Sequence, residues 1–283
     1  MKQANRCEAG TLFVVATPIG NLGDLSPRAL ETLKTVDLVA AEDTRHSGAL
    51  LSHFGIRKKR VSLHSHNEAA QSEQLLARLL AGESVALVSD AGTPLISDPG
   101  FPLIRAAREH GVRVAPIPGP SAVIAALSVA GLPCERFAFE GFLPAKRAAR
   151  RQKLEALAGE PRTLAFYESP HRITEMMSDL ADVLGGDRQV FLGRELTKLH
   201  EQSFVGTAQA ALQWLGADDH HRKGEFVVII EGAPAAKASH SDEDLLLKTL
   251  LEYLSVKDAS HAAARILGGS RKALYNRLLA LKP

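Results

Sequence analysis

The sequence predicts an α/β protein of two lobes followed by a small all-α tail. Short apolar runs alternate with amphipathic runs from residue 11 to residue 130, which is typical of strands and helices around a mainly parallel sheet. Beyond Gly131 the pattern changes. Two neighbouring strand-like runs, 189–193 and 202–205, favour antiparallel pairing within a mixed second sheet.

The first lobe, which we place at residues 1–118, begins with a buried strand and a loop of turn-forming residues. Ser26 and Pro27 are typical of a helix start, with serine as the cap and proline in the first helical position. Further helices are expected to end near Leu80 and His110. The strands of this lobe are expected at Thr11–Ala16, Asp37–Ala41, Val61–His64, Ser84–Val88 and Gly111–Ala115.

The second lobe, placed at residues 119–232, opens with a small-residue helix within Ser121–Ala130. Two longer amphipathic runs predict helices at Lys146–Leu157, which is strongly basic, and at Ile173–Leu184. Its strands are expected at Arg136–Phe142, Arg162–Tyr167, Gln189–Gly193, Gln202–Val205 and Glu225–Glu231.

Residues 233–241 are a linker by composition, and residues 242–283 form a helical tail that resembles a helix-turn-helix unit. The sequence Gly268-Gly269-Ser270 provides the turn before the last helix. The three tail helices are expected at Asp242–Leu254, Asp258–Leu267 and Arg271–Leu281.

Composition limits the class of protein. A net charge of +2 over 283 residues does not by itself indicate a polyanionic partner, so any nucleic-acid argument must be local. The two cysteines, Cys7 and Cys134, lack metal-type spacing, and no signal peptide is evident, which favours a reduced, cytoplasmic protein. The uncharged run Val114–Cys134 is interrupted by prolines at 116, 118 and 120, so we expect no membrane span.

Several common motifs are absent from the sequence. It has no Gly-x-Gly-x-x-Gly, no Walker loop, no Gly-x-Ser-x-Gly and no Cys/His metal spacing, which disfavours nicotinamide redox chemistry, ATP hydrolysis, esterase chemistry and a metal site. Loops of small residues instead follow predicted strands, where ligands bind in open α/β sheets. They are Thr17–Gly23, Ser89–Pro94, Pro118–Ala122 and Tyr167–Arg172. Such loops suit a neutral or weakly charged ligand held by backbone groups.

Six motifs in this order resemble one family, the bacterial 16S ribosomal RNA (cytidine) 2′-O-ribose methyltransferases of the tetrapyrrole methylase superfamily. The motifs are Thr17–Asp24, Ala41–Arg45, His66–Glu68, Ser89–Gly100, Pro118–Ala122 and Phe166–Arg172. The resemblance covers residues 11–232, and the tail is similar to the family's C-terminal extension. It implies a tetrapyrrole-methylase-like fold, S-adenosylmethionine as methyl donor, a cleft between two α/β domains and a homodimer. It also implies a cytidine in the decoding region of the small ribosomal subunit as acceptor.

The resemblance also implies which residues contact the donor. Carried over by position, these are Pro18, Ala91, Gly92, Thr93, Ile96, Ser121, Ala122, Tyr167 and Glu168. Pyrrole-modifying relatives have Gly-Gly-Asp-Pro where this chain has Ala91-Gly92-Thr93-Pro94. The missing aspartate puts one polar donor contact in doubt and argues against a tetrapyrrole acceptor.

A ribose 2′-hydroxyl is a poor nucleophile, so a base within hydrogen-bond reach should help, although positioning alone is able to provide much of the rate. The candidate bases are Glu42, Asp43, Glu68, Glu168 and His171. We favour Asp43, with Arg45 holding a phosphate or orienting the carboxylate, and keep Glu168 as a second catalytic candidate. The alternative is that Asp43 only caps the next helix and pairs with Arg45.

The predicted RNA contacts rest on local positive charge. They are Lys146, Arg147, Arg150 and Arg151 on the basic helix, Arg172 after a strand end, and Arg271 and Lys272 in the tail. Each has a plainer alternative: a solvated helix face for the first group, a pair between Arg172 and Glu168 at the domain junction, and helical dimer packing for the tail.

Two other functions compete with RNA ribose methylation. A tetrapyrrole C-methyltransferase would methylate a porphyrinoid, and a ligand-sensing nucleic-acid-binding regulator would bind S-adenosylmethionine without transferring its methyl group. Incubation with labelled donor and ribosomal substrates distinguishes the three.

Overall fold

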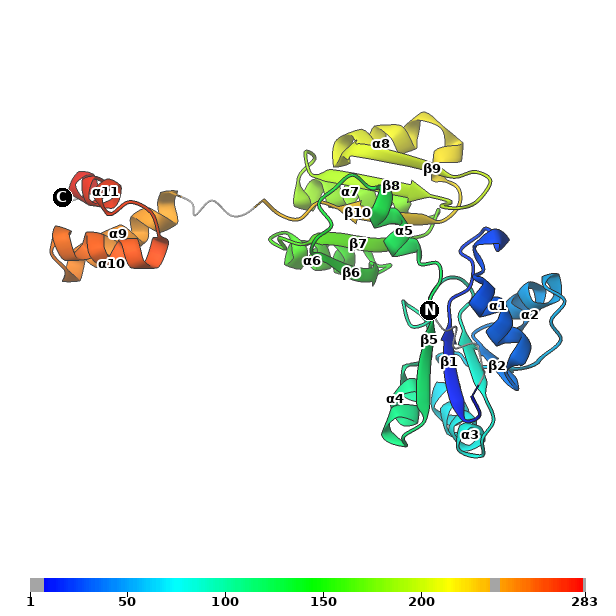
Figure 1. Ribbon diagram of the computed structural model, residues 1–283. Helices are drawn as coiled ribbons and strands as arrows, with labels where there is room; N and C mark the ends of the chain where they lie inside the picture. Colours follow the sequence, from blue (N-terminus) through cyan, green and yellow to red (C-terminus); the bar gives the residue numbers. More distant parts are fainter. Residues whose placement is uncertain (1–7, 235–239, 282–283) are drawn as a thin grey trace. The chain divides into compact units, whose positions relative to one another are not determined.

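The structure, a computed structural model, describes residues 8–234 and 240–281. The chain divides into two units, Met1–Gly232 and Ala233–Pro283. The first unit contains two five-stranded sheets, and the second contains three helices (Figure 1). The α/β class, the parallel first sheet and the all-α tail are confirmed. The predicted limit between the lobes near residue 118 stays a prediction.

The first sheet has the order β3-β2-β4-β1-β5, with every pair parallel. The strands are β1 (Thr11–Val15), β2 (Leu38–Ala41), β3 (Lys59–Ser62), β4 (Val85–Val88) and β5 (Arg113–Ile117). The helices are η1 (Leu22–Asp24), α1 (Pro27–Thr35), α2 (Thr44–His53), α3 (Glu68–Leu80) and α4 (Phe101–Glu109). Separate apolar clusters join the sheet to α1 and α2 and to α3 and α4, so both faces are covered.

The two edge strands differ most from the prediction. β3 begins at Lys59, two residues before the predicted start, and β5 extends to Ile117 through Pro116. Lys59 and Arg60 are exposed, as edge strands tolerate. Pro116 has no N–H group and cannot donate a hydrogen bond to a neighbouring strand. An edge strand tolerates this, because one of its sides has no neighbouring strand to bond.

The second sheet is mixed, with the order β6-β7-β10-β8-β9. Only β6 and β7 are parallel, and the predicted antiparallel pairing of β8 with β9 is confirmed. The strands are β6 (Phe137–Phe142), β7 (Thr163–Glu168), β8 (Gln189–Arg194), β9 (Gln202–Thr207) and β10 (Phe226–Ile230). The helices are α5 (Ala122–Val129), α6 (Arg147–Leu157), α7 (Ile173–Leu184), α8 (Ala208–Ala217) and η2 (Asp219–Arg222).

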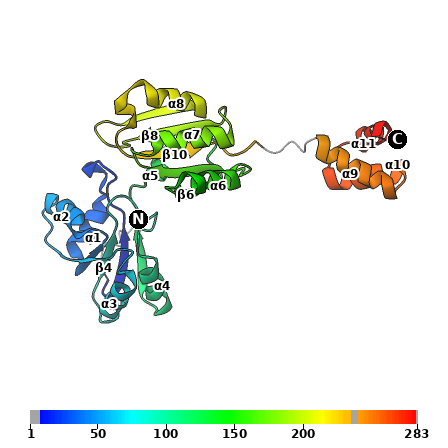
Figure 2. The same ribbon diagram turned by 180° about the vertical axis from the view of Figure 1, so that it is seen from behind.

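Helices cover both faces of this sheet as well. Apolar side chains of α6, α7 and α8 share one cluster with it, and those of α5 share another (Figures 1 and 2). The sequence analysis missed α8. Its start is a standard cap, because the side chain of Thr207 accepts a hydrogen bond from the N–H of Ala210 at 3.2 Å.

The second unit is a small helical core of α9 (His240–Tyr253), α10 (Val256–Leu267) and α11 (Arg271–Leu281). Its buried residues are Leu247, Ala259, Ala263, Leu274 and Leu278. α9 begins two residues before the predicted helix start at Asp242, within the predicted linker. Residues 235–239 of that linker, and Cys7, lie outside the described residues. Within the described part of the chain, no helix has the length and apolar character that crossing a membrane requires.

Candidate active site

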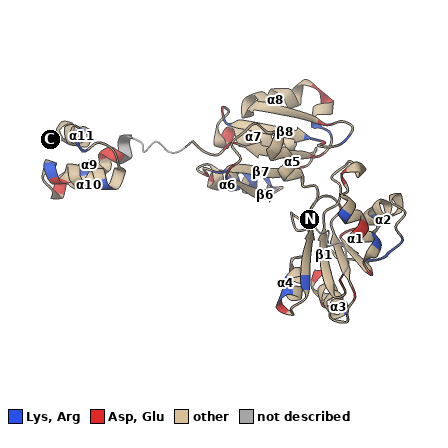
Figure 3. Cartoon of the chain, in the orientation of Figure 1, with Lys and Arg blue, Asp and Glu red and all other residues tan. Residues whose placement is uncertain are grey.

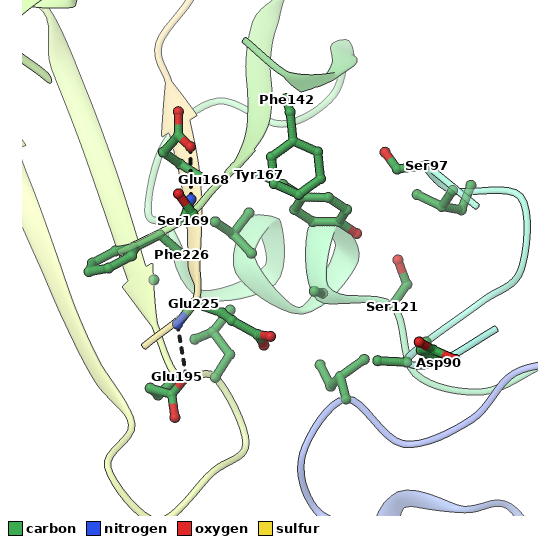
Figure 4. A pocket seen from close by; sticks show the side chains of 18 of the residues that line it. Asp90, Ser97, Ser121, Phe142, Tyr167, Glu168, Ser169, Glu195, Glu225 and Phe226 are labelled. Atoms are coloured by element: carbon green, nitrogen blue, oxygen red, sulfur yellow. Dashed lines mark hydrogen bonds between the residues drawn. The ribbon is translucent and has the colours of Figure 1, made fainter. Parts of the chain in front are cut away.

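A cavity of about 450 Å³ lies within the first unit, a size ordinary for a small-molecule site. Strand-end loops of both sheets line it, together with the start of α5 (Figure 4). The lining residues from the first sheet and α5 are Ile19, Asp90, Ala91, Gly92, Thr93, Ile96, Ser97, Asp98, Ser121 and Ala122. Those from the second sheet are Phe142, Tyr167, Glu168, Ser169, Pro170, Gly193, Glu195, Leu196, Lys198, Glu225, Phe226 and Val227.

Hydrogen bonds tie three of the predicted small-residue loops together. The N–H of Thr17 donates to the carbonyl of Gly92 at 2.9 Å, and the N–H of Gly92 donates back to Thr17 at 3.1 Å. Thr93 Oγ1 donates to the carbonyl of Pro120 at 2.9 Å, which brings in the loop before α5. Gly92 has φ +80°, and a Cβ there would lie 3.2 Å from Ile19 Cγ2, so the close approach favours glycine. The loops therefore form one wall, as predicted from their position at strand ends.

The β4 loop continues in a strained conformation. Leu95 and Ser97 have φ of 76° and 73°, which side chains with a Cβ rarely adopt. The residue that caps α4 is Gly100. Glu68 accepts a hydrogen bond from the N–H of Gly100 at 2.5 Å, so this candidate base anchors the loop instead.

Tyr167 provides an aromatic surface on the opposite wall. Its ring lies 4.9 Å from that of Phe139 and 5.6 Å from that of Phe142, measured between centroids. Figure 4 shows Phe142 and Tyr167 packed together, on the side of the cavity that faces Ser97 and Ser121. Burial raises the pKa of Tyr167 to about 12, so the phenol keeps its proton.

Glu168 follows Tyr167 and is buried. Its carboxylate accepts a hydrogen bond from the N–H of Ser169 at 2.8 Å and lies 3.1 Å from the guanidinium of Arg172. Burial raises the pKa of Glu168, and both partners oppose that rise. Arg172 also donates to the carbonyl of Leu143 at 2.5 Å. Arg172 is thus a partner of Glu168, and its contact with RNA stays a prediction.

Asp43 and Arg45 are not among the residues that line the cavity. Asp43 caps α2 by accepting from the N–H of Arg45 at 2.7 Å, and its other oxygen lies 2.9 Å from the Arg45 guanidinium. Hydrogen bonds from Arg45 lower the pKa of Asp43 to about 2, which makes it a weak base. The plainer interpretation of this pair, a helix cap with an ion pair, is observed, and the catalytic role of Asp43 and Arg45 stays a prediction.

The arginines of the predicted RNA-binding face of α6 form ion pairs with acidic residues, and their contacts with RNA stay a prediction. Arg150 is 1% exposed, and its Nε lies 2.8 Å from Asp179 Oδ2 on α7. Arg147 and Arg151 pair with the same carboxylate at 2.9 and 3.3 Å, and Arg151 also pairs with Asp182. These arginines stabilise a helix pair instead of forming a free basic face. Lys146, at the start of α6, is exposed.

The tail residues Arg271 and Lys272 are exposed in the first turn of α11. Figure 3 shows both signs of charge on the tail helices. Basic side chains elsewhere in the tail, such as Arg277, form ion pairs with acidic neighbours. The exposed pair at the start of α11 is consistent with the predicted interface.

Of the nine predicted donor-contacting residues, eight line the cavity: Ala91, Gly92, Thr93, Ile96, Ser121, Ala122, Tyr167 and Glu168. The exception is Pro18, which is buried next to the lining residue Ile19.

Two groups of lining residues were missed by the sequence analysis. One is Asp98, whose pKa burial raises to about 6, with the charges of Glu42 and Asp90 adding to the rise. It belongs to the motif Ser89–Gly100, but the sequence gives no sign that the loop turns its carboxyl group inward.

The other missed group is the turn after β8. Lys198 Nζ lies 2.8 Å from carboxylate oxygens of both Glu195 and Glu225. Glu195 and Thr197 have φ of 51° and 69°, so this turn too is strained. The sequence of this turn is an ordinary polar stretch between two strands, so it does not predict that Glu195 and Thr197 adopt positive φ.

The charge of the lining is mostly acidic. Asp90, Asp98, Glu168, Glu195 and Glu225 contribute carboxyl groups, against the single ammonium group of Lys198. Because Lys198 is already paired with two carboxylates, the cavity does not offer a phosphate clamp. It suits a small, positively charged ligand with an apolar part. Within the described residues, no group of His, Cys, Asp and Glu is placed to hold a metal ion.

Comparisons with known proteins agree with this site. Residues 11–212 match the family model of tetrapyrrole (corrin/porphyrin) methylases, and residues 237–282 match that of the RsmI C-terminal HTH domain. The chain is 56% identical over 267 residues to the ribosomal RNA small subunit methyltransferase I of Xylella fastidiosa strain Temecula1, covering 94% of this chain and 98% of the relative. It is 52% identical over 271 residues to the protein of that name from Escherichia coli O157:H7, covering 95% of each.

Solved structures show the same fold at low sequence identity. The methyltransferase CobJ aligns with a TM-score of 0.59 at 18% identity, over 80% of this chain and 95% of that one. Uroporphyrin-III-C-methyltransferase from Thermus thermophilus aligns with a TM-score of 0.54 at 21% identity, over 78% of this chain and 94% of that one.

Proposed function

This chain belongs to the tetrapyrrole methylase family, within its ribosomal RNA small subunit methyltransferase I group, and we propose that it 2′-O-methylates a cytidine ribose in 16S ribosomal RNA. Membership of the family makes it an S-adenosylmethionine-dependent methyltransferase. The finer proposal concerns the acceptor: a cytidine of the decoding region, reached in 16S RNA or in the small ribosomal subunit.

The convergence of Thr93, Ser121 and Tyr167 on one cavity is the observation that carries the donor site. The residues present fit S-adenosylmethionine, because carboxylates favour its sulfonium and ammonium charges and the Tyr167 ring offers an apolar face. The donor supplies an already activated methyl group, so the work of the protein is to bind, orient and exclude water.

Each wall of the cavity has a separate task in this proposal. The β4 loop offers backbone groups at Ala91, Gly92 and Thr93, held in place by their bonds to neighbouring loops. Ser121 and Ala122 add the start of α5, and Tyr167 and Glu168 close the opposite side. Pro18 is buried and precedes Ile19 in the chain, and it does not itself line the cavity.

For the RNA side we propose contacts from the tail. Arg271 and Lys272 are exposed at the start of a helix in a unit that matches a helix-turn-helix family model. Lys146 is a further exposed candidate in the first unit. We also propose a homodimer in the cytoplasm, on the resemblance alone. Light scattering of the purified protein tests the dimer.

The function is tested with purified protein, labelled S-adenosylmethionine and ribosomal RNA that has never carried the modification. Free 16S RNA and assembled small subunits are compared as acceptors, and the RNA is digested to nucleosides for mass spectrometry. We expect label in 2′-O-methylcytidine. Label on a base, or only in an added porphyrinoid, would overturn the proposal.

A further inference from the structure

An exposed aromatic ring lies at the edge of the cavity. Phe142, the last residue of β6, lines the cavity and is 55% exposed. The other aromatic residues of the lining are more covered, since Phe226 is 2% exposed and Tyr167 is half-buried. Exposed apolar surface beside a cavity is typical of a place that a ligand covers. A molecule that enters the cavity from solvent therefore meets Phe142 before it meets Tyr167.

A bulge in β6 brings this ring to the cavity. The pairing of β6 with β7 shifts by one residue between Phe139 and Gly141, and Gly141 has φ +67°. In a regular strand Phe139 and Phe142 would point to opposite faces, because side chains alternate. With the extra residue, both rings contact Tyr167. A Cβ at Gly141 would lie 3.5 Å from Ser97 Oγ, so the bulge also meets the loop after β4. Bulges that re-aim a side chain in this way are common next to active sites.

The ring is held from two sides. Its centroid lies 5.6 Å from that of Tyr167, with 57° between the ring planes (Figure 4). The next residue, Leu143, is 2% exposed, and its carbonyl accepts a hydrogen bond from Arg172 at 2.5 Å. The position of Phe142 is therefore set before any ligand arrives, which lowers the entropy cost of stacking on its exposed surface.

The part of the proposed acceptor that suits such a ring is the nucleobase. Unpaired bases in RNA stack on aromatic side chains, and enzymes that act on one nucleotide take its base out of the stack. Lys146, four residues after Phe142, is exposed and offers a positive charge for a phosphate. An aromatic ring with a cation near it in the chain is typical of sites for single-stranded nucleic acid.

We propose that Phe142 stacks on the nucleobase of the acceptor nucleotide and so places the ribose of that nucleotide beside the methyl donor. This inference rests on the proposed function, because it assumes an RNA acceptor. The stack positions the nucleotide without selecting cytidine, since every base has a π-face. The rival role is that Phe142 contacts the donor alone, as an extension of the Tyr167 ring.

The first test compares Phe142→Leu with Phe142→Tyr. Leucine keeps an apolar side chain against Tyr167 but has no π-face, whereas tyrosine keeps the ring. At saturating S-adenosylmethionine we expect kcat/KM for RNA to fall about 10- to 100-fold in Phe142→Leu and to recover most of the wild-type value in Phe142→Tyr. Phe137→Leu is the matched control, because it makes the same change at the start of the same strand, outside the lining.

Calorimetry of donor binding separates this role from its rival. The donor dissociation constant of Phe142→Leu should rise less than about threefold, well below the loss in kcat/KM for RNA. A donor affinity that falls as far as kcat/KM would assign the ring to the donor and overturn the proposal. Equal activity of the leucine and tyrosine variants would overturn it as well.

A second test detects the stack directly and does not depend on the folding of Phe142→Leu. Trp214 is the only tryptophan of the chain, so Phe142→Trp with Trp214→Phe leaves one fluorescent reporter. With S-adenosylhomocysteine bound, addition of the acceptor that the wild type methylates should quench this emission. Phe137→Trp with Trp214→Phe is the control, and the acceptor contributes equally to both signals. Equal quenching in the two proteins would contradict the stack.

These experiments also distinguish the inference from the proposed function. If the wild type transfers no methyl group to ribosomal RNA, both fail. If the wild type methylates the RNA and Phe142→Leu does so equally well, the function stands and only the role of Phe142 fails.

Discussion

The side chain of Lys198 packs directly over the backbone of Gly20. A Cβ on Gly20 would lie 2.3 Å from Cγ of Lys198, and Gly20 has φ +143°. Lys198 belongs to the turn after β8 and Gly20 to the loop after β1, so the contact joins loops of the two sheets at the edge of the cavity. A methyl group at Gly20 has to push Lys198 away from Glu195 and Glu225.

We therefore expect Gly20→Ala to weaken S-adenosylmethionine binding at least about tenfold, a loss of ~1.4 kcal/mol, by displacing Lys198. Gly111→Ala is the matched control, because Gly111 also has positive φ but nothing within 4 Å of its added Cβ. Calorimetric titration of both variants measures the effect. Equal affinity in the two variants would show that the contact does not matter for binding.

Asp43→Ala should affect stability more than catalysis. Loss of the α2 cap is expected to lower the free energy of unfolding measurably, and methyl transfer should fall less than about tenfold. Urea unfolding and single-turnover kinetics measure the two quantities. A fall of ~100-fold or more with unchanged donor affinity would support Asp43 as the base.

Asp98 should make stability depend on pH. Burial raises its pKa to about 6, whereas an unfolded aspartate titrates near ~3.9. Between these values the folded state binds more protons than the unfolded one, so this contribution to stability falls as pH rises from about 4 to 6.

Asp98→Asn removes that contribution. Above pH 6 the variant should gain stability relative to wild type, by an amount of order 1 kcal/mol after allowing for partial solvent screening. The difference should shrink toward pH 4. Urea unfolding of both proteins across this range measures it, and a difference that does not vary with pH would contradict the raised pKa.

Arg150→Ala should destabilise the protein strongly without affecting RNA affinity. The change leaves Asp179, itself 1% exposed, with fewer partners, and breaking a buried ion pair in this way typically costs ~3–5 kcal/mol. Thermal unfolding and RNA binding by the folded variant are the measurements. An unchanged melting temperature with weakened RNA binding would support α6 as part of the RNA interface.

Removing the positive charges of Arg271 and Lys272 in the tail should weaken RNA binding and leave stability unchanged. Arg271→Ala with Lys272→Ala is expected to leave stability unchanged and to reduce the slope of log affinity against log salt by about 1 to 2, through lost counterion release. Arg105→Ala, at an exposed position of α4, is the control for general charge. An unchanged salt slope in the double variant would exclude these residues from the interface.

The sequence predicted the fold well where residues are buried on both faces of a sheet. β1, β2 and β4 are continuous apolar runs, so their positions were predicted to within one residue. β3 was displaced because Lys59 and Arg60 do not differ from loop residues by polarity. The loops that line the cavity were predicted by the resemblance and by their place after strands.

The features that the sequence did not predict involve partners that are distant in sequence. The sequence of the run Arg147–Arg151 does not predict that Asp179, on another helix, forms ion pairs with its arginines. The place of Asp98 in the lining was missed for a related reason. Asp98 is buried within a loop in which Leu95 and Ser97 have positive φ and Gly100 donates to Glu68, and neither feature can be predicted from the sequence.

The reciprocal bonds between Thr17 and Gly92 join main-chain atoms, so they constrain the shape of the rim without using a side chain, and the close approach favours glycine at residue 92. A rim built in this way tolerates substitution at the positions that meet the acceptor, since the enclosing scaffold does not depend on them. If this cavity holds the methyl donor, as we propose, the acceptor is then able to change in evolution while the main-chain scaffold around the donor stays the same.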